Sequence, residues 1–313
     1  MVSRSPRWAR LLIILMTTAA LLGLPLQVAA HGGGYHTKAE FKVTALTDAV
    51  SPGQSAAFQV FLRSDGSDAF DKIRLEGKAP GGTITSAPDG CWTSGASFSC
   101  HLGKLKSGKT LTLQFVYATP PVAGSLTLSA SLKVESWHWG HKKTKEAFKG
   151  SASTAIIDSP DFFGGWQPSH ASTLSFSTAG IGGANEQTTS VQVPPVGSGY
   201  PLRLAEVDES IRCGHKTITG FGEAVDMSIA NGATLSPHLT LTLTYTKAAV
   251  GYRSAHDIRF VHLTDDGDCQ FPPRGCSYHN DGFCFDAWWT GHGYGKKLVI
   301  RVELPSNGRG KGL

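Results

Sequence analysis

The chemistry in this sequence that is easiest to specify lies at His31, which directly follows Val28-Ala29-Ala30. Small residues at those positions are what signal peptidase requires, so cleavage after Ala30 would free the α-amine of His31. An amine and an imidazole on one residue chelate copper, and imidazole suits Cu²⁺ well. His36 is the candidate second imidazole, and the other candidates are His138, His141 and His170.

The residues beside His31 argue against a built copper site. Gly32, Gly33 and Gly34 form a flexible run that holds a catalytic metal poorly. We therefore expect a solvated His/Gly-rich tail with no cofactor, and we keep copper bound by His31 and His36 as the alternative.

Paired tryptophans suggest a second kind of chemistry, because exposed aromatic faces bind sugar rings. Trp137 and Trp139 stand two positions apart, so on a strand they share one face, whereas Trp288 and Trp289 point to opposite faces. Packing in a core is the alternative interpretation for most tryptophans. The sequence thus offers Trp137 and Trp139 as a candidate ligand-binding face for a glycan.

The cysteines predict cross-links. Six cysteines all follow the cleavage site, which suits an oxidising exterior. Cys91 and Cys100 are nine positions apart and are expected to bridge. The other four allow three pairings, of which we favour Cys269 with Cys276 and Cys213 with Cys284. A zinc site is the alternative for these four, although they lack a C-x-x-C spacing.

We expect no catalytic residues and no enzyme activity. Gly197-Ser198-Gly199 is too short for a nucleophile elbow, and both the H-E-x-x-H motif and a Gly-rich phosphate loop are missing. Asp265-Asp266-Gly267-Asp268 resembles a Ca²⁺-binding turn, but the full ligand pattern of such loops is missing, and a plain hairpin turn explains it as well.

The N-terminus and the charge predict location and exclude some partners. Arg4, Arg7 and Arg10 precede an apolar run that is shorter than the ~20 residues a bilayer demands, so residues 1–30 are expected to be a signal peptide, not an anchor. Their removal takes the formal charge from +5 to +2. That balance offers no footprint for nucleic acid. A released, extracellular protein without a membrane anchor is the expectation.

Short alternating runs predict an all-β chain. In Thr110–Tyr117 every second residue is apolar, as in a strand with one buried face, and no stretch has a helical apolar period. Further strands are expected at Glu40–Leu46, Ala56–Leu62, Lys72–Leu75, Leu126–Glu135, Thr173–Ser177, Thr189–Val193, Leu202–Val207, Ala224–Ile229, Leu239–Tyr245, Asp257–His262 and Leu298–Leu304. Ile211–Phe221 and Cys269–Gly291 are expected to be loops.

Turn signals and changes of texture divide the chain. After the signal peptide we expect a tail at 31–39, a domain at 40–136, a linker at 137–160 and a second β-rich domain at 161–313. Regularly spaced short strands favour two disulfide-stapled β-sandwiches of immunoglobulin-like type.

The first of these domains resembles the bacterial conserved-repeat domain, domain of unknown function 11. The resemblance covers about residues 40–136 and rests on Val50–Gln54, Cys91–Cys100, the turn at 102–108 and Ala123–Ala130. Arg63–Asp68 departs from the family pattern. The resemblance implies an immunoglobulin-like sandwich of extracellular or wall-associated proteins, with no catalytic residues to carry over.

These observations favour a secreted structural or adhesive protein whose partner is a cell-wall or extracellular glycan, or a protein. A copper protein using His31 and a carbohydrate-binding module using Trp137 and Trp139 are the alternatives.

Overall fold

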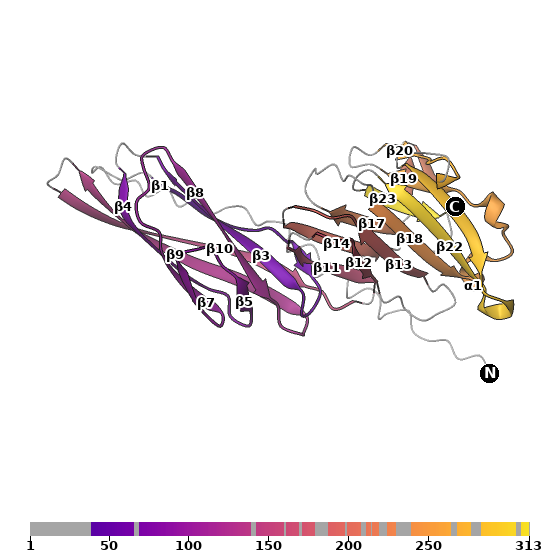
Figure 1. Cartoon of the computed structure of the whole chain (residues 1–313), viewed down its shortest axis with the longest axis horizontal. Coiled ribbons are helices and arrows are strands. Elements are labelled where there is room, and N and C mark those ends of the chain that lie inside the picture. Colours follow the sequence, from indigo (N-terminus) through magenta and orange to yellow (C-terminus); the bar gives the residue numbers. More distant parts are fainter. Residues whose placement is uncertain are drawn as a thin grey trace. The chain divides into compact units, whose positions relative to one another are not determined.

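The computed structural model describes most of the chain after residue 38. The described residues are 39–65, 69–138, 142–159, 161–168, 171–178, 187–197, 199–207, 211–213, 215–218, 224–229, 239–263, 268–276, 283–304 and 308–312. Nearly all the regular structure in these ranges is β-strand (Figure 1). The all-β prediction is therefore confirmed.

Two sheets form the first β-sandwich. One has the strand order β1-β3-β8-β5 and the other the order β2-β10-β9-β4-β7-β6. The strands of the first sheet are β1 (Ala39–Ala45), β3 (Ser55–Ser64), β8 (Thr110–Ala118) and β5 (Thr83–Ser86). Those of the second are β2 (Ala49–Val50), β10 (Lys142–Ile156), β9 (Gly124–His138), β4 (Phe70–Lys78), β7 (Ser97–His101) and β6 (Cys91–Ser94).

Alternating side chains hold these two sheets together. Along β4, Ile73 and Leu75 are buried while Lys72 and Arg74 are exposed, so the apolar side of the strand faces the other sheet. Phe98 from the second sheet stacks on Phe115 from the first, with ring centroids 3.8 Å apart. The core therefore lies between the two sheets.

The predicted linker at 137–160 is wrong over most of its length. Lys142–Ile156 is β10, which pairs antiparallel with β9 along its whole length. Sequence texture hides this strand because its inward positions include small residues such as Gly150. A Cβ added at Gly150 would meet Val43 at 3.0 Å, so the neighbouring strand leaves no room for a large apolar side chain.

The second β-sandwich also has two sheets, with strand orders β11-β14-β17-β23-β19-β20 and β12-β13-β18-β22-β21. The first contains β11 (Phe162–Gln167), β14 (Tyr200–Val207), β17 (Ala224–Ile229), β23 (Gly308–Gly312), β19 (Phe260–Leu263) and β20 (Cys269–Gln270). The second contains β12 (Leu174–Ser177), β13 (Gln187–Val193), β18 (Leu239–Thr246), β22 (Lys297–Leu304) and β21 (Cys284–Thr290). A separate hairpin is formed by β15 (Ile211–Cys213) and β16 (Lys216–Ile218).

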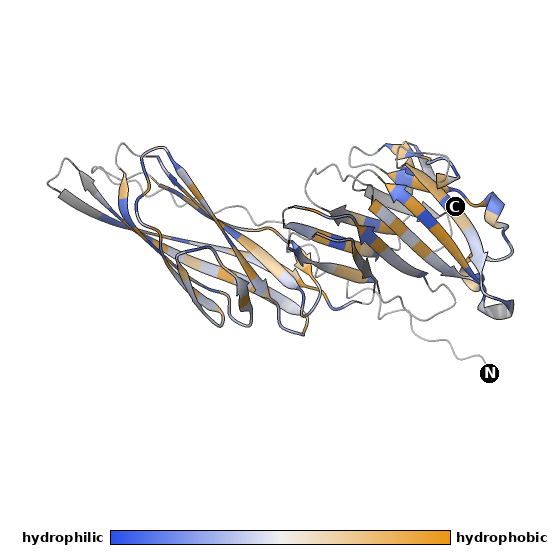
Figure 2. Cartoon of the chain, in the orientation of Figure 1, coloured by the Kyte–Doolittle hydropathy of each residue, from blue (hydrophilic) through white to orange (hydrophobic). Residues whose placement is uncertain are grey.

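The core of this sandwich follows the same rule of alternation. In β18 every second residue from Leu239 to Tyr245 is buried, and β22 alternates in the same way. Figure 2 shows this as hydrophobic and hydrophilic residues following each other along the strands. Both strands were predicted, and their register pairs Leu241 with Val302 and Leu243 with Ile300.

Some expectations for this half are corrected by the structure. Asp257 belongs to a short 3₁₀ helix, Ala255–Asp257, and the strand expected there begins at Phe260. The predicted loops contain β15, β16, β20 and β21. The described helices, α1 (Lys247–Val250) among them, are all too short to cross a membrane.

All six cysteines form disulfides, and one of the three predicted pairs is right. Cys91 bonds to Cys100, as expected. The other two pairs, Cys269 with Cys276 and Cys213 with Cys284, are wrong: the bonds are Cys213–Cys269 and Cys276–Cys284.

Tertiary packing explains the two corrected disulfides. Cys213 and Cys269 both pack against the buried pair Ala224 and Val261, which brings the β15 hairpin to β20. The segment before Cys276 lies along β21, where Gly275 donates its amide to the Phe285 carbonyl at 2.9 Å. That contact sets Cys276 beside Cys284. Neither contact follows from spacing in the sequence.

Candidate functional site

The feature with the most exposed functional groups is the outer side of the six-stranded sheet of the first sandwich. The alternation that buries Ile73 and Leu75 turns the intervening residues of β4 to solvent, and the register carries this side across neighbouring strands. We call this side the outer face. Its charged residues among those described are Lys72, Arg74, Glu76, Lys78, Lys133, Glu135, Lys145 and Lys149.

One edge of the outer face carries an exposed aromatic ring. Trp92 of β6 is 68% exposed, and its ring meets the ring of His101 edge-on with centroids 5.4 Å apart. His101 Nε2 lies 3.2 Å from an Arg74 guanidinium nitrogen. The three side chains therefore lie on the same side of the sheet, and the histidine connects the tryptophan to the basic residues of β4.

Ion pairs on the outer face are few and long. The Glu76 carboxylate lies 3.8 Å from Arg74 Nε and 3.8 Å from Lys133 Nζ, and the Glu135 carboxylate lies 3.7 Å from Lys145 Nζ. Exposed pairs of this kind contribute little to stability. The described outer face holds six cations against two carboxylates, so its formal charge is strongly positive.

The opposite outer side of the same sandwich is different. Glu40, Lys42 and Arg63 are its charged residues on β1 and β3, and Arg63 pairs with Asp65 at 2.8 Å. An open depression of about 260 Å³ on this sheet is lined by segment 86–88 and by β8 residues between Thr112 and Val116. These lining groups include hydroxyls and an amide but no titratable side chain.

A buried carboxyl group is the main perturbed acid of the second sandwich. Glu206 is 9% exposed and accepts a 2.6 Å hydrogen bond from the Thr178 hydroxyl. Burial raises its pKa above the ordinary value of 4.5, hydrogen bonds from Thr178 and Thr189 oppose the rise, and the nearby charge of Asp161 adds to it. Burial also raises the pKa of Asp161. The carboxyl is held inside the sandwich by this polar cluster.

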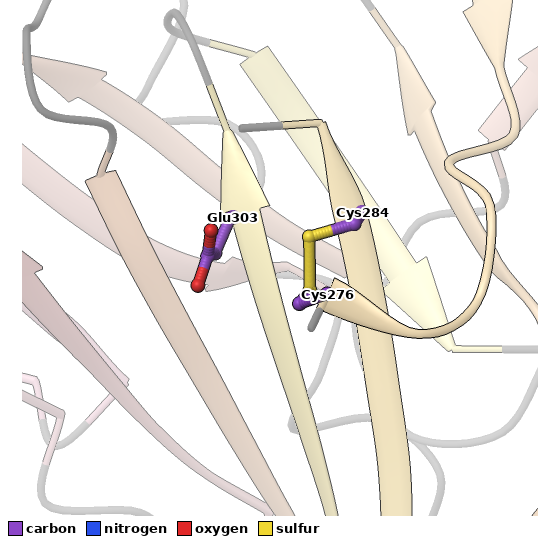
Figure 3. A group of neighbouring side chains, drawn as sticks. All are labelled: Cys276, Cys284 and Glu303. Atoms are coloured by element: carbon purple, nitrogen blue, oxygen red, sulfur yellow. A yellow bond between two sulfur atoms is a disulfide. The ribbon is translucent and has the colours of Figure 1, made fainter. Parts of the chain in front are cut away.

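The described residues contain one grouping that resembles a metal site, namely Cys276, Cys284 and Glu303 (Figure 3). The two sulfur atoms are bonded to each other, and Glu303 accepts a 3.1 Å hydrogen bond from Arg301. Zinc is bound by thiolates, which a disulfide does not offer. The grouping is therefore a cross-link beside a carboxylate.

The predicted ligand-binding residues can be placed only in part. His31, His36, His141 and His170 lie outside the described residues, and so does Trp139. Trp137 and His138 end strand β9, and their side chains are outside the description. Copper binding and a Trp137/Trp139 platform thus stay predictions. Trp288 and Trp289 do point to opposite sides: Trp288 is 43% exposed, and Trp289 packs against the core.

Sequence reasoning did not single out Trp92, His101 or the outer-face cations. A signal was present, because Lys72, Arg74, Glu76 and Lys78 alternate with other residues at the period of a strand. Only the pairing of β4 with β9 and of β9 with β10 shows that charges from three strands share one side.

No family model and no curated protein sequence matches this chain. Solved structures that resemble it include a non-cellulosomal cohesin from the archaeon Archaeoglobus fulgidus, with 12% identity over 38% of this chain and 92% of that chain, and a TM-score of 0.29. BslA, a bacterial hydrophobin, has 16% identity over 40% and 97% of the two chains and a TM-score of 0.27. A PapD-like domain of human CEP192 has 14% identity over 42% and 94%, with a TM-score of 0.25. The fold assignment rests on the strands and sheets described above.

Proposed function

We propose that this chain works outside the cell as a non-enzymatic β-sandwich protein with a structural or adhesive role. The observation that carries the proposal is the pairing of all six cysteines in three disulfides, with no free cysteine. Disulfides persist in oxidising compartments and are rare in the cytosol. The signal-peptide pattern of residues 1–30 supports the same location.

The adhesive part of the proposal is supported by the outer face. It is an open, strand-built side whose exposed residues are charged groups, hydroxyls and one aromatic ring. A sandwich fold hosts many unrelated tasks, so the argument depends on this surface and not on the fold. Cell-wall or extracellular glycan, or a protein, is the proposed partner. Membership of residues 40–136 in the conserved-repeat family belongs to the same proposal and is supported by the motifs named above.

Location is tested by fractionating a culture of the producing organism and trapping thiols with an alkylating reagent before lysis. The expected result is protein in the medium or on the cell wall, with no thiol alkylated. Protein found inside the cell with alkylated cysteines would contradict the proposal.

Adhesion is tested by co-sedimentation with the producer's isolated cell wall and with extracellular glycans. We expect the native protein to sediment with one of these materials, and the reduced and alkylated chain serves as the control. Recovery of nothing in the pellet would reject the adhesive role and leave the structural one.

A further inference from the structure

We propose that the outer face of the first sandwich binds an anionic polysaccharide, with cations of β4, β9 and β10 pairing with its acidic groups and Trp92 stacking on a sugar ring. This proposal rests on the proposed extracellular role and specifies the partner. The occupant is chosen by charge and by the exposed aromatic ring.

The first step is the concentration of charge. The described outer face carries Lys72, Arg74, Lys78, Lys133, Lys145 and Lys149 against Glu76 and Glu135, a formal charge of +4. The whole chain has a formal charge of +5, and three of those charges are the arginines of residues 1–30. Positive charge is thus gathered on one side of one sandwich, which is the arrangement that attracts a polyanion.

The second step is the availability of those cations. The printed partners of Arg74, Lys133 and Lys145 are carboxylates 3.7 to 3.8 Å away, at the long end of the ion-pair range. The side chains of Lys133 and Lys145 are 61% and 71% exposed. An approaching acidic group can therefore contact these ammonium groups without breaking a buried interaction.

The third step is Trp92, which points to a sugar and not to an arbitrary polyanion. Its ring is exposed on the edge strand β6, and its contact with His101 restricts its orientation. A preoriented ring loses little conformational entropy when a ligand binds. Residues paired across the sheet from Trp92 include Ser99 and, two strands further, Ser131, whose hydroxyls suit hydrogen bonding to a polyol.

The fourth step is size. Strands β10 and β6 are four steps apart in the sheet, which at ~4.8 Å a step spans about 19 Å. An extended polymer laid across the strands thus reaches both the lysines of β10 and Trp92. A single sugar unit would meet only one of these groups, so the proposal requires a polymer.

The test measures binding of the full chain to immobilised polygalacturonate, a polymer of acidic sugars, at about 50 mM and about 500 mM salt. Dextran serves as the neutral polysaccharide, polyglutamate as the polyanion without sugar rings, and single-stranded DNA as the nucleic acid. We expect binding to polygalacturonate at low salt that is strongly weakened at high salt, and weak binding to the other three polymers.

Two variants test the residues. The triple variant Lys72→Gln, Lys133→Gln, Lys149→Gln should weaken polygalacturonate binding at least about tenfold. The control triple Lys106→Gln, Lys109→Gln, Lys297→Gln removes the same charge from exposed positions outside this sheet and should leave binding within about twofold. Trp92→Ala should weaken binding about tenfold, and Trp92→Phe should restore most of it.

Thermal melts of all variants confirm that each one is folded. Equal binding of polyglutamate or DNA, or binding unaffected by Trp92→Ala, would overturn the polysaccharide assignment. Equal loss in both triple variants would overturn the assignment to the outer face. No binding to any polymer, by a protein that still sediments with the cell wall, would overturn this inference while leaving the proposed function intact.

Discussion

Glu206 provides a prediction at the scale of one residue, because burial raises the pKa of its carboxyl in the folded chain. Between the ordinary value of 4.5 and the raised value, the folded state binds more protons than the unfolded state. The free energy of unfolding must therefore fall as pH rises through this window. Glu206→Gln removes that fall and should raise Tm at neutral pH by about 2–4 °C.

Thermal melts of both proteins from about pH 4 to about pH 8 measure this effect. Asp161, whose pKa burial also raises, contributes a smaller fall of the same sign in both proteins. Parallel pH profiles for the wild type and the variant would contradict the assignment to Glu206.

Gly77 yields a second prediction for one residue. It lies in β4 opposite Phe98, and a Cβ added there would overlap the Phe98 ring, which stacks on Phe115. Gly77→Ala should therefore lower the free energy of unfolding by about 1–3 kcal/mol, since a packed core resists added volume.

Gly197→Ala is the matched control, because its added Cβ meets nothing within 4 Å. Urea unfolding of the two variants measures the difference. Equal stability of Gly77→Ala and Gly197→Ala would show that the Phe98 ring moves aside without cost.

At the scale of elements, the two disulfides of the second sandwich should differ in what they contribute. Cys213–Cys269 closes 56 positions and Cys276–Cys284 closes 8. Loop-closure entropy gives about 4 kcal/mol for the longer loop and about 2.5 kcal/mol for the shorter one. The double variant Cys213→Ala, Cys269→Ala should unfold at lower urea concentration than Cys276→Ala, Cys284→Ala. The reverse order would contradict the pairing described here.

Strands with clear alternation could be predicted from the sequence, and others could not. Thr110–Tyr117 and Leu239–Tyr245 have an apolar residue at every second position and fold as β8 and β18. By contrast, β10 has small residues inside and lysines and serines outside, and β23 is Gly308–Gly312, which has no apolar side chain. Backbone pairing with β17 and β19 places β23, and no sequence period reports such pairing.

The candidate site was predictable only in its parts. The charges of β4 alternate visibly, but the outer face exists because register places Lys133 opposite Arg74 and Lys149 opposite Ser131. Trp92 stands next to a cysteine, and its exposure depends on β6 being an edge strand. For the disulfides, closeness in sequence identified Cys91–Cys100, while Cys213–Cys269 depends on contacts between distant strands.

At the scale of the whole molecule, two disulfide-bonded sandwiches share a single chain with an uneven distribution of charge. Net charge alone suggested no electrostatic partner, since the sum hides the positive outer face. A protein of this kind would bind through one side while its remaining surface stays nearly neutral. That reading is the extracellular adhesive role proposed above, with an anionic polysaccharide as the partner.

The central claim is that this is an extracellular protein whose six cysteines are all cross-linked. The most direct test is a peptide map, made without reduction, of the protein purified from its own producer after thiols are trapped. The account predicts three linked peptide pairs, Cys91 with Cys100, Cys213 with Cys269 and Cys276 with Cys284, and a chain that begins at His31. Trapped thiols at these cysteines, in a chain recovered from inside the cell, would contradict it.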